Sequence, residues 1–255
     1  MGRPQLLVSV RSPEEALLAV RGGADIVDVK EPSAGPLGMA PLDTLRRILQ
    51  TFENIPQPPP LSFALGELRD WFGSCPQPAK TASAFREAFA GLLQEHPAVC
   101  FLKCGLAGCR SIPNWEQHWA QLRQLATPAV AWVAVAYADA DRADAPDPAH
   151  VLSAAIDANA RVVLIDTFVK DGKRLPDWLS PQQLQAFARE CHRHNLLLAL
   201  AGQVSHLDFP VLRDAGADVI AVRGAACDSA DRLQSVSEHR VRALVEALRA
   251  DADGP

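Results

Sequence analysis

Short apolar runs rich in Val, Ile, Leu or Ala recur eight times along the 255 residues, and a longer segment with helical spacing of apolar residues follows each run. The predicted strands cover residues 6–10, 26–30, 61–66, 100–105, 130–137, 162–167, 196–201 and 219–223. Eight strand–helix alternations in about 250 residues are typical of a single-domain (β/α)8 (TIM) barrel, with a doubly wound open sheet as the lesser alternative. We expect the barrel to span residues 1–250 and residues 251–255 to form a frayed tail.

A weak internal repeat agrees with this alternation. The segment GADIVDVK at residues 23–30 aligns with GADVIAVR at residues 216–223. Each segment reads as a turn followed by a buried strand. The repeat therefore places Lys30 and Arg223 at equivalent strand ends.

Composition narrows the class of partner. Hydrophobic residues make up 48% of the chain, and the net charge of -5 comes from interspersed charges of both signs. This pattern argues against a nucleic-acid or membrane-surface partner and favours a small molecule. No apolar run approaches the roughly 20 residues that cross a bilayer, and the N-terminus does not read as a leader, so we expect a cytoplasmic protein.

The six cysteines do not suggest a disulfide framework in a chain of this length. Cys100, Cys104 and Cys109 lie close together, but their spacing fits none of the common zinc or iron–sulfur patterns. We expect reduced thiols that pack in the core or lie at the surface, and we expect no metal ion and no cofactor.

Two tryptophans bear on self-association. Trp71 and Trp178 fall in segments that read as loops, where we expect both side chains to be exposed. Exposed aromatic surface favours contact with a second copy. We therefore expect a homo-oligomer.

Charged side chains close four of the predicted strands. Lys30, Lys103, Asp166 and Arg223 end strands two, four, six and eight. Active sites of such barrels form at the C-terminal ends of the strands, and alternate strands contribute to the same interior layer. The sequence therefore predicts one pocket that these four side chains share.

Asp28 precedes Lys30 by two residues, so both side chains lie on one face of the predicted strand. An acid and an amine are expected side by side at the strand's exit. A buried ion pair that only holds the core together is the alternative, although such pairs contribute little stability.

The last two strands end in small residues. Gly202 closes strand seven, and Arg223 is followed by Gly224 and Ala225. Small residues at these exits let backbone N–H groups approach an anion, which is where such barrels commonly bind phosphate. The glycines could instead only turn the chain, but the charge of Arg223 favours a phosphate ester as the substrate handle.

Three further residues complete the expected substrate-binding set. Ser9 lies one residue before the end of the first strand, and Tyr137 and Asp139 lie at the exit of the fifth. On the polar loop after strand six, Lys170 either reaches over the pocket or remains a solvated charge.

Lysines that converge in a partly dry pocket repel one another, and both desolvation and like charge lower the pKa of an amine. An uncharged amine forms a Schiff base with a carbonyl group. Asp28 and Asp166 could position the amines or relay protons, although their attraction favours the charged form.

The chain resembles the (5-formylfuran-3-yl)methyl phosphate synthase family, also called 4-(hydroxymethyl)-2-furancarboxaldehyde-phosphate synthase. The resemblance is weak across residues 67–99 and 107–128, and Glu31 stands where Asn is expected in relatives. The matching segments are GADIVDVKEPSAGPLG at 23–38, FLKCGL at 101–106, AYADADR at 136–142, LIDTFVKDGK at 164–173, LALAG at 198–202 and AVRGAAC at 221–227.

The resemblance implies a (β/α)8 barrel lyase that condenses two molecules of glyceraldehyde 3-phosphate into a phosphorylated furan aldehyde for methanofuran synthesis. Carried onto matching positions, Lys30 would be the Schiff-base lysine and Lys103 the proton acceptor. Asp28, Asp166 and Lys170 would assist them.

Two other functions remain open from the residues. One is a different Schiff-base aldolase that acts on a sugar phosphate, which the absence of a conjugated furan product would reveal. The other is a barrel that binds a phosphorylated metabolite without catalysis. The lysines at the matching positions disfavour the second alternative.

Overall fold

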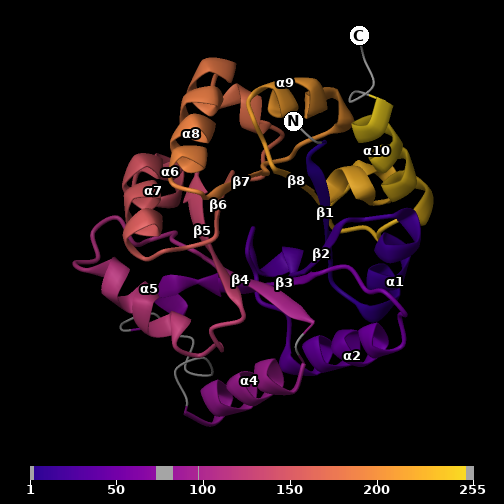
Figure 1. The fold of residues 1–255 in the computed structure, drawn as a ribbon, viewed down its shortest axis with the longest axis horizontal. Coiled ribbons are helices and arrows are strands. Elements are labelled where there is room, and N and C mark those ends of the chain that lie inside the picture. Colours follow the sequence, from indigo (N-terminus) through magenta and orange to yellow (C-terminus); the bar gives the residue numbers. More distant parts are fainter. Residues whose placement is uncertain (1–2, 73–82, 97, 251–255) are drawn as a thin grey trace.

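A computed structural model describes residues 3–72, 83–96 and 98–250 of the chain. Eight parallel strands form one closed barrel in sequence order, with β1 paired to β8 (Figure 1). The predicted single-domain TIM barrel is therefore confirmed. The strands are β1 (Gln5–Val10), β2 (Ile26–Val29), β3 (Leu61–Glu67), β4 (Val99–Gly105), β5 (Ala131–Tyr137), β6 (Val162–Asp166), β7 (Leu197–Leu200) and β8 (Val219–Val222).

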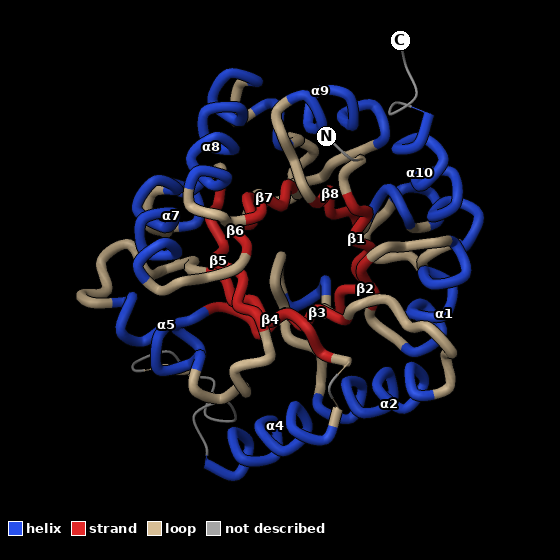
Figure 2. The backbone as a smooth tube through the Cα atoms, in the orientation of Figure 1, coloured by secondary structure: helices blue, strands red, loops and turns tan. Residues whose placement is uncertain are grey.

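Helices surround the barrel as an outer ring (Figure 2). They are α1 (Pro13–Gly22), α2 (Leu42–Glu53), α4 (Ser83–Glu95), α5 (Trp115–Arg123), α6 (Ala140–Ala143), α7 (Pro148–Asp157), α8 (Pro181–Arg193), α9 (Phe209–Asp214) and α10 (Glu238–Ala250). A 3-10 turn, His206–Asp208, directly precedes α9. The four-residue α6 was not predicted because it is too short to show helical spacing of apolar residues.

The start of α1 shows how local sequence sets the element boundaries. Ser12 is the N-cap, and its side chain accepts a hydrogen bond from the backbone N–H of Glu15 at 3.2 Å. Pro13 then occupies the first helical turn, where its missing N–H costs nothing. This turn directs the chain from β1 into the outer ring.

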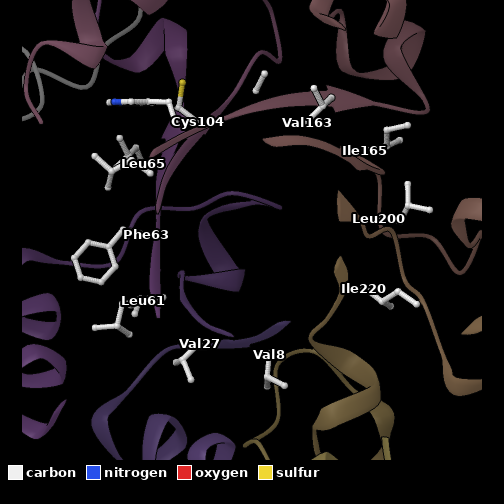
Figure 3. Close-up of a cluster of buried hydrophobic side chains, with 14 of the residues drawn as sticks. Val8, Val27, Leu61, Phe63, Leu65, Cys104, Val163, Ile165, Leu200 and Ile220 are labelled. Carbon is white, nitrogen blue, oxygen red and sulfur yellow. The ribbon is translucent and has the colours of Figure 1, made fainter. Parts of the chain in front are cut away.

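Alternation along the strands separates two apolar layers. Side chains such as Val8, Val27, Phe63 and Ile220 point from the strands toward the helices and form the larger core (Figure 3). The alternate residues, among them Leu7, Ile26 and Val219, belong to a smaller cluster that includes the inner face of the barrel. At the C-terminal ends, polar and charged residues replace this inner layer.

Two expectations about side-chain exposure meet different outcomes. Trp71 was expected at the surface but is fully buried, because its ring packs on Phe85 and Phe89 and its indole N–H donates to the Leu65 carbonyl at 2.9 Å. Trp178 is half-buried rather than exposed. Neither tryptophan therefore provides the exposed aromatic surface that was expected to favour self-association.

Cys104 and Cys109 are buried in the larger core, which is one of the two locations expected for the thiols. Burial raises the pKa of Cys109 to about 12. The predicted tail at 251–255 lies outside the described residues. No helix within the described ranges is long and apolar enough to span a membrane.

Candidate active site

A cavity of about 440 Å³ opens where the C-terminal ends of the strands meet, and we call it the mouth cavity. Lys30, Lys103, Asp166 and Arg223 all line it, so the four side chains of the even-numbered strands converge as predicted. Lys30 directly follows β2, and Asp166 is the last residue of β6. Lys103 lies deeper, two residues before β4 ends.

Lys103 forms a buried ion pair with Asp28. Their Nζ and Oδ1 atoms are 2.8 Å apart, and the other Asp28 oxygen accepts a hydrogen bond from the Ser9 hydroxyl at 2.9 Å. The acid was expected beside Lys30 on its own strand. It instead pairs across β3, where the small residues Ser62 and Ala64 lie between the two strands and leave room for the contact.

Lys30 differs from the other lysines of the cavity. Its side chain is buried, and its ammonium group has no hydrogen bond or ion pair with any described residue. Burial lowers the pKa of Lys30 to about 8, partly opposed by Asp166 and Asp28 and assisted by Lys103 and Lys170. The uncharged Lys30 amine is therefore much more populated near neutral pH than that of an ordinary lysine.

Lys170, in contrast, has acceptors for all three of its ammonium protons. Its Nζ donates to Asp166 Oδ1 at 2.7 Å, to the Thr167 carbonyl at 2.6 Å and to the Thr167 hydroxyl at 3.1 Å. Burial alone would raise the pKa of Asp166, but attraction to Lys170 and Lys30 holds it below its ordinary value. Asp166 therefore stays ionised between two lysines. We call Lys30, Lys103, Lys170, Asp28 and Asp166 the lysine cluster.

Asp139 serves the loop that carries Lys170. Its two carboxylate oxygens accept hydrogen bonds from the backbone N–H groups of Phe168 at 2.6 Å and Val169 at 2.9 Å. The side chain is 2% exposed and does not line the mouth cavity. We expected Asp139 to contact substrate. It instead holds the loop that carries Lys170.

Tyr137 was also expected to touch substrate, but it is fully buried and outside the cavity lining. Its hydroxyl donates to Glu67 Oε1 at 2.8 Å, while Glu67 Oε2 accepts the Ala107 N–H at 2.8 Å. Gly105 makes room for this pair, because a Cβ there would lie 2.1 Å from Glu67 Oε2 and 2.3 Å from the Tyr137 hydroxyl.

Glu67 is a residue that sequence reasoning missed. Burial raises its pKa to about 7, against the opposing hydrogen bonds from Ala107 and Tyr137. Burial and the Glu67 charge raise the pKa of Tyr137 well above its ordinary value. Glu67 ends β3 just as Asp166 ends β6, and a strand drawn one residue longer would have revealed it.

Arg223 was expected to bind phosphate, but all five of its guanidinium N–H groups have acceptors within the protein. Three are the carbonyls of Ser9 at 3.0 Å, Arg232 at 2.9 Å and Gln234 at 2.8 Å. The Glu15 carboxylate accepts the other two in a buried ion pair. Arg223 therefore holds the loop after β8 in place and leaves no N–H free for an anion.

The small residues at the ends of β7 and β8 do line the mouth cavity, as expected. Gly202 adopts a φ of 111°, a left-handed value that favours glycine. Gly224 and Ala225 begin a 3-10 turn, Gly224–Ala226, and their backbone N–H groups have no acceptor among the described residues. Two adjacent N–H groups of this kind can hold a phosphate oxygen.

The rim of the cavity contains two arginines that sequence reasoning did not select, Arg174 and Arg232. Arg174 pairs with Asp208 at 2.8 Å and so joins the loops after β6 and β7. Within the described ranges, no group of three or more His, Cys, Asp or Glu side chains is placed to hold a metal ion. The polar groups that line the cavity include amines, carboxylates, guanidinium groups and backbone N–H groups.

Solved structures share the fold. Thiamine phosphate pyrophosphorylase from Pyrococcus furiosus superposes with a TM-score of 0.59 at 10% identity, covering 97% of this chain and 96% of that protein. Phosphoribosyl anthranilate isomerase from Thermus thermophilus gives a TM-score of 0.56 at 13% identity, covering 96% and 98%. At these identities the likeness shows the barrel alone.

Relatives in sequence are much more similar. Proteins called (5-formylfuran-3-yl)methyl phosphate synthase are 37% identical in Methanopyrus kandleri, over 96% of this chain and 99% of theirs, and 35% identical in Methanocaldococcus jannaschii, over 89% and 92%. The family model described as 4-HFC-P synthase matches residues 6–245. With a family match over nearly the whole barrel and relatives of this similarity, the chain belongs to the 4-HFC-P synthase family.

Proposed function

We propose that this protein is a lyase that condenses two molecules of glyceraldehyde 3-phosphate into (5-formylfuran-3-yl)methyl phosphate, for the synthesis of methanofuran-type cofactors. The names of its relatives support the product. The one observation that carries the chemistry is the buried Lys30 amine, which faces the mouth cavity without an ion-pair partner.

Lys30 is the nucleophile of the proposed reaction. Its uncharged amine attacks the aldehyde carbon of one triose phosphate, and the resulting carbinolamine loses water to give a Schiff base. The lowered pKa of Lys30 supplies the uncharged amine near neutral pH. The negative charges of Asp166 and Asp28 then stabilise the protonated Schiff base.

Lys103 and Asp28 together take up the proton from the carbon next to the Schiff base. Within their ion pair, Lys103 passes its proton to Asp28, and the uncharged amine accepts the substrate proton. The electron pair left on carbon gives an enamine, which attacks the aldehyde carbon of the second triose phosphate. Lys170, held by Asp166 and Thr167, is placed to neutralise the oxygen anion that this attack creates.

The later steps close the ring. Formation of the furan from two triose phosphates releases one phosphate and two waters in total, and hydrolysis of the Schiff base returns the Lys30 amine. Aromatisation of the ring makes the overall reaction favourable. The cavity of about 440 Å³ falls within the range of about 300–1,000 Å³ that is usual for small-molecule sites.

Borohydride reduction tests the proposal directly. Purified protein is incubated with glyceraldehyde 3-phosphate, the ultraviolet absorbance of the furan aldehyde is followed, and a reduced sample is digested for mass spectrometry. We expect a triose adduct on Lys30, and we expect adduct formation to rise with pH up to about 8 as Lys30 loses its proton.

The matched variants are Lys30→Met and Lys173→Met, which remove a buried cavity lysine and an exposed loop lysine. Lys30→Met should abolish the adduct and lower the condensation rate by about 10³-fold or more, since the nucleophile is gone. Lys173→Met should retain both. Turnover by Lys30→Met at the wild-type rate, or an adduct on another lysine, would refute the proposal.

A further inference from the structure

The loop after β8 contributes a second arginine to the mouth cavity. Residues 227–236 fold back on themselves, with Cys227 bridged to Val236, and Arg232 lies in the middle of this loop. The loop packs against Gly224, because a Cβ there would lie 3.0 Å from the Ala230 oxygen and 3.6 Å from the Arg232 nitrogen.

Arg223 and Arg232 have complementary roles in this loop. Arg223 donates its Nε–H to the carbonyl of Arg232 at 2.9 Å, and its other N–H groups are also occupied. Arg232 uses only its Nη2 group, which donates to the carbonyls of Pro32 at 3.0 Å and Gly35 at 3.1 Å. Its Nε and Nη1 groups have no acceptor among the described residues, and the side chain lines the cavity.

The contacts of Arg232 also connect it to Lys30. Pro32 and Gly35 belong to the loop that directly follows Lys30, so one guanidinium bridges the loop after β8 and the loop after β2. Gly224 and Ala225 line the same cavity as Lys30 and Arg232, so an anion that contacts their N–H groups shares this cavity with the Lys30 amine. Burial lowers the pKa of Arg232, although the charge of Asp166 opposes this effect.

We infer that Arg232 is the cation that binds the phosphate of the triose whose aldehyde reacts with Lys30. A free N–H group of Arg232 donates to a phosphate oxygen, and the backbone N–H groups of Gly224 and Ala225 complete the site. A guanidinium suits this contact because it keeps its positive charge and holds its N–H groups in a rigid plane. This inference rests on the proposed function for the identity of the aldehyde, but the phosphate contact can be tested separately.

The test compares trapping of two aldehydes at Lys30, glyceraldehyde 3-phosphate and unphosphorylated glyceraldehyde, in wild type and R232M. The variant should raise the concentration of the phosphorylated aldehyde needed for half-maximal trapping by about 10- to 100-fold. The concentration of unphosphorylated glyceraldehyde needed for half-maximal trapping should change by less than about twofold. R46M, which removes an exposed arginine of α2, is the matched control and should leave both values unchanged.

The outcomes separate a phosphate ligand from a residue that only holds the loop. Equal loss of trapping with both aldehydes would assign Arg232 to loop position alone and overturn the inference, as would no change with either. R232K keeps a positive charge but replaces the planar guanidinium with a flexible ammonium group, so it should fall between wild type and R232M with the phosphorylated aldehyde only.

A direct measurement keeps the inference distinct from the proposed function. Calorimetric titration with inorganic phosphate should show binding to wild type that R232M weakens about tenfold or more. If wild type forms no adduct with either aldehyde but binds phosphate through Arg232, the proposed chemistry fails and the binding residue stands. Equal phosphate affinity of wild type and R232M would overturn the inference.

Discussion

Two groups of buried titratable side chains lie at the C-terminal ends of the strands, and they differ in what they face. Four members of the lysine cluster, Lys30, Lys103, Lys170 and Asp166, line the mouth cavity, and one of its amines has no partner. The Glu67–Tyr137 pair lies outside the lining of that cavity, and each of its hydroxyl and carboxylate oxygens has a hydrogen-bond partner. Burial shifts a pKa in both places, to about 8 for Lys30 and about 7 for Glu67.

The difference shows that a shifted pKa alone does not identify a reacting group. Glu67 spends its hydrogen-bonding capacity on Tyr137 and Ala107, so it ties together the ends of β3, β4 and β5. Lys30 has the same burial cost but faces open volume and no fixed partner. The shifted group that a substrate can reach is the one expected to react.

After the loss of Lys30 itself, the largest expected effect on the condensation rate comes from Lys103→Met, which removes the proposed proton acceptor of the lysine cluster. Condensation should slow by about 10²–10⁴-fold, the usual contribution of general acid–base catalysis. Trapping at Lys30 should persist. The pH of half-maximal trapping should rise, because Lys103 no longer repels the Lys30 ammonium. Both quantities come from the absorbance and borohydride assays.

The same substitution leaves the Asp28 carboxylate buried with Ser9 as its remaining contact, so Lys103→Met should destabilise the fold by about 3–5 kcal/mol. Urea unfolding at pH 7 measures this loss. The double variant Asp28→Asn with Lys103→Met removes both charges and should recover most of it. An unchanged midpoint in the single variant would contradict the role of this ion pair.

A smaller effect of opposite sign is expected for Lys30→Met. The folded pKa of about 8 lies below the ordinary value of 10.5, so between these values the folded protein binds fewer protons than the unfolded chain. Wild type therefore gains stability as pH rises through this window and bears the cost of a buried charge below it. Lys30→Met should be more stable by about 2–3 kcal/mol at pH 7, with the gap closing toward pH 10.

Urea unfolding at pH 7 and pH 9.5 measures this difference, with Lys173→Met as the control that should follow wild type at both values. A Lys30→Met protein no more stable than wild type at pH 7 would show that the buried amine carries no such cost. Lys30 would then not differ from Glu67 as a buried group without a partner.

The smallest effect is expected at the Glu67–Tyr137 pair. The folded pKa of Glu67, about 7, lies above its ordinary value of 4.5, so its contribution to stability is complete below about pH 4.5 and is lost as pH rises through 7. Glu67→Gln cannot ionise and should gain about 1–2 kcal/mol on wild type between pH 5 and pH 8. Exposed Glu246→Gln should show no such change in the same urea titrations.

Condensation activity sharpens the contrast further. Glu67→Gln should leave the rate within about threefold of wild type, because the residue touches no substrate in the proposed reaction. A loss comparable to that of Lys103→Met would move Glu67 into the reacting group and end the distinction between the two regions.

The sequence predicted the barrel well because each strand and helix has its own local signal. Convergence of Lys30, Lys103 and Asp166 followed from strand ends alone. Pairing across strands did not, since Asp28 meets Lys103 only because Ser62 and Ala64 are small. Such contacts depend on three strands at once.

The rim of the cavity was predicted least well. Arg223 looked like the phosphate ligand, but its partner Glu15 lies in α1, 208 residues away in the chain. Arg232 has no strand or helix to mark it, because it lies in an irregular loop. Residues whose function depends on loop conformation give no periodic signal. Only the folded structure distinguishes Arg223, whose N–H groups are all occupied, from Arg232, which keeps some of them free.

Closure of the barrel by pairing of β1 with β8 has a consequence for synthesis on the ribosome. Ser9 supports Asp28 from the first strand, while Gly224 follows the last, so a nascent chain that stops before residue 219 has no complete reaction chamber. Unfinished or truncated copies would expose the amines of the proposed site without an enclosing cavity. The proposed reaction therefore requires the final strand to dock beside the first.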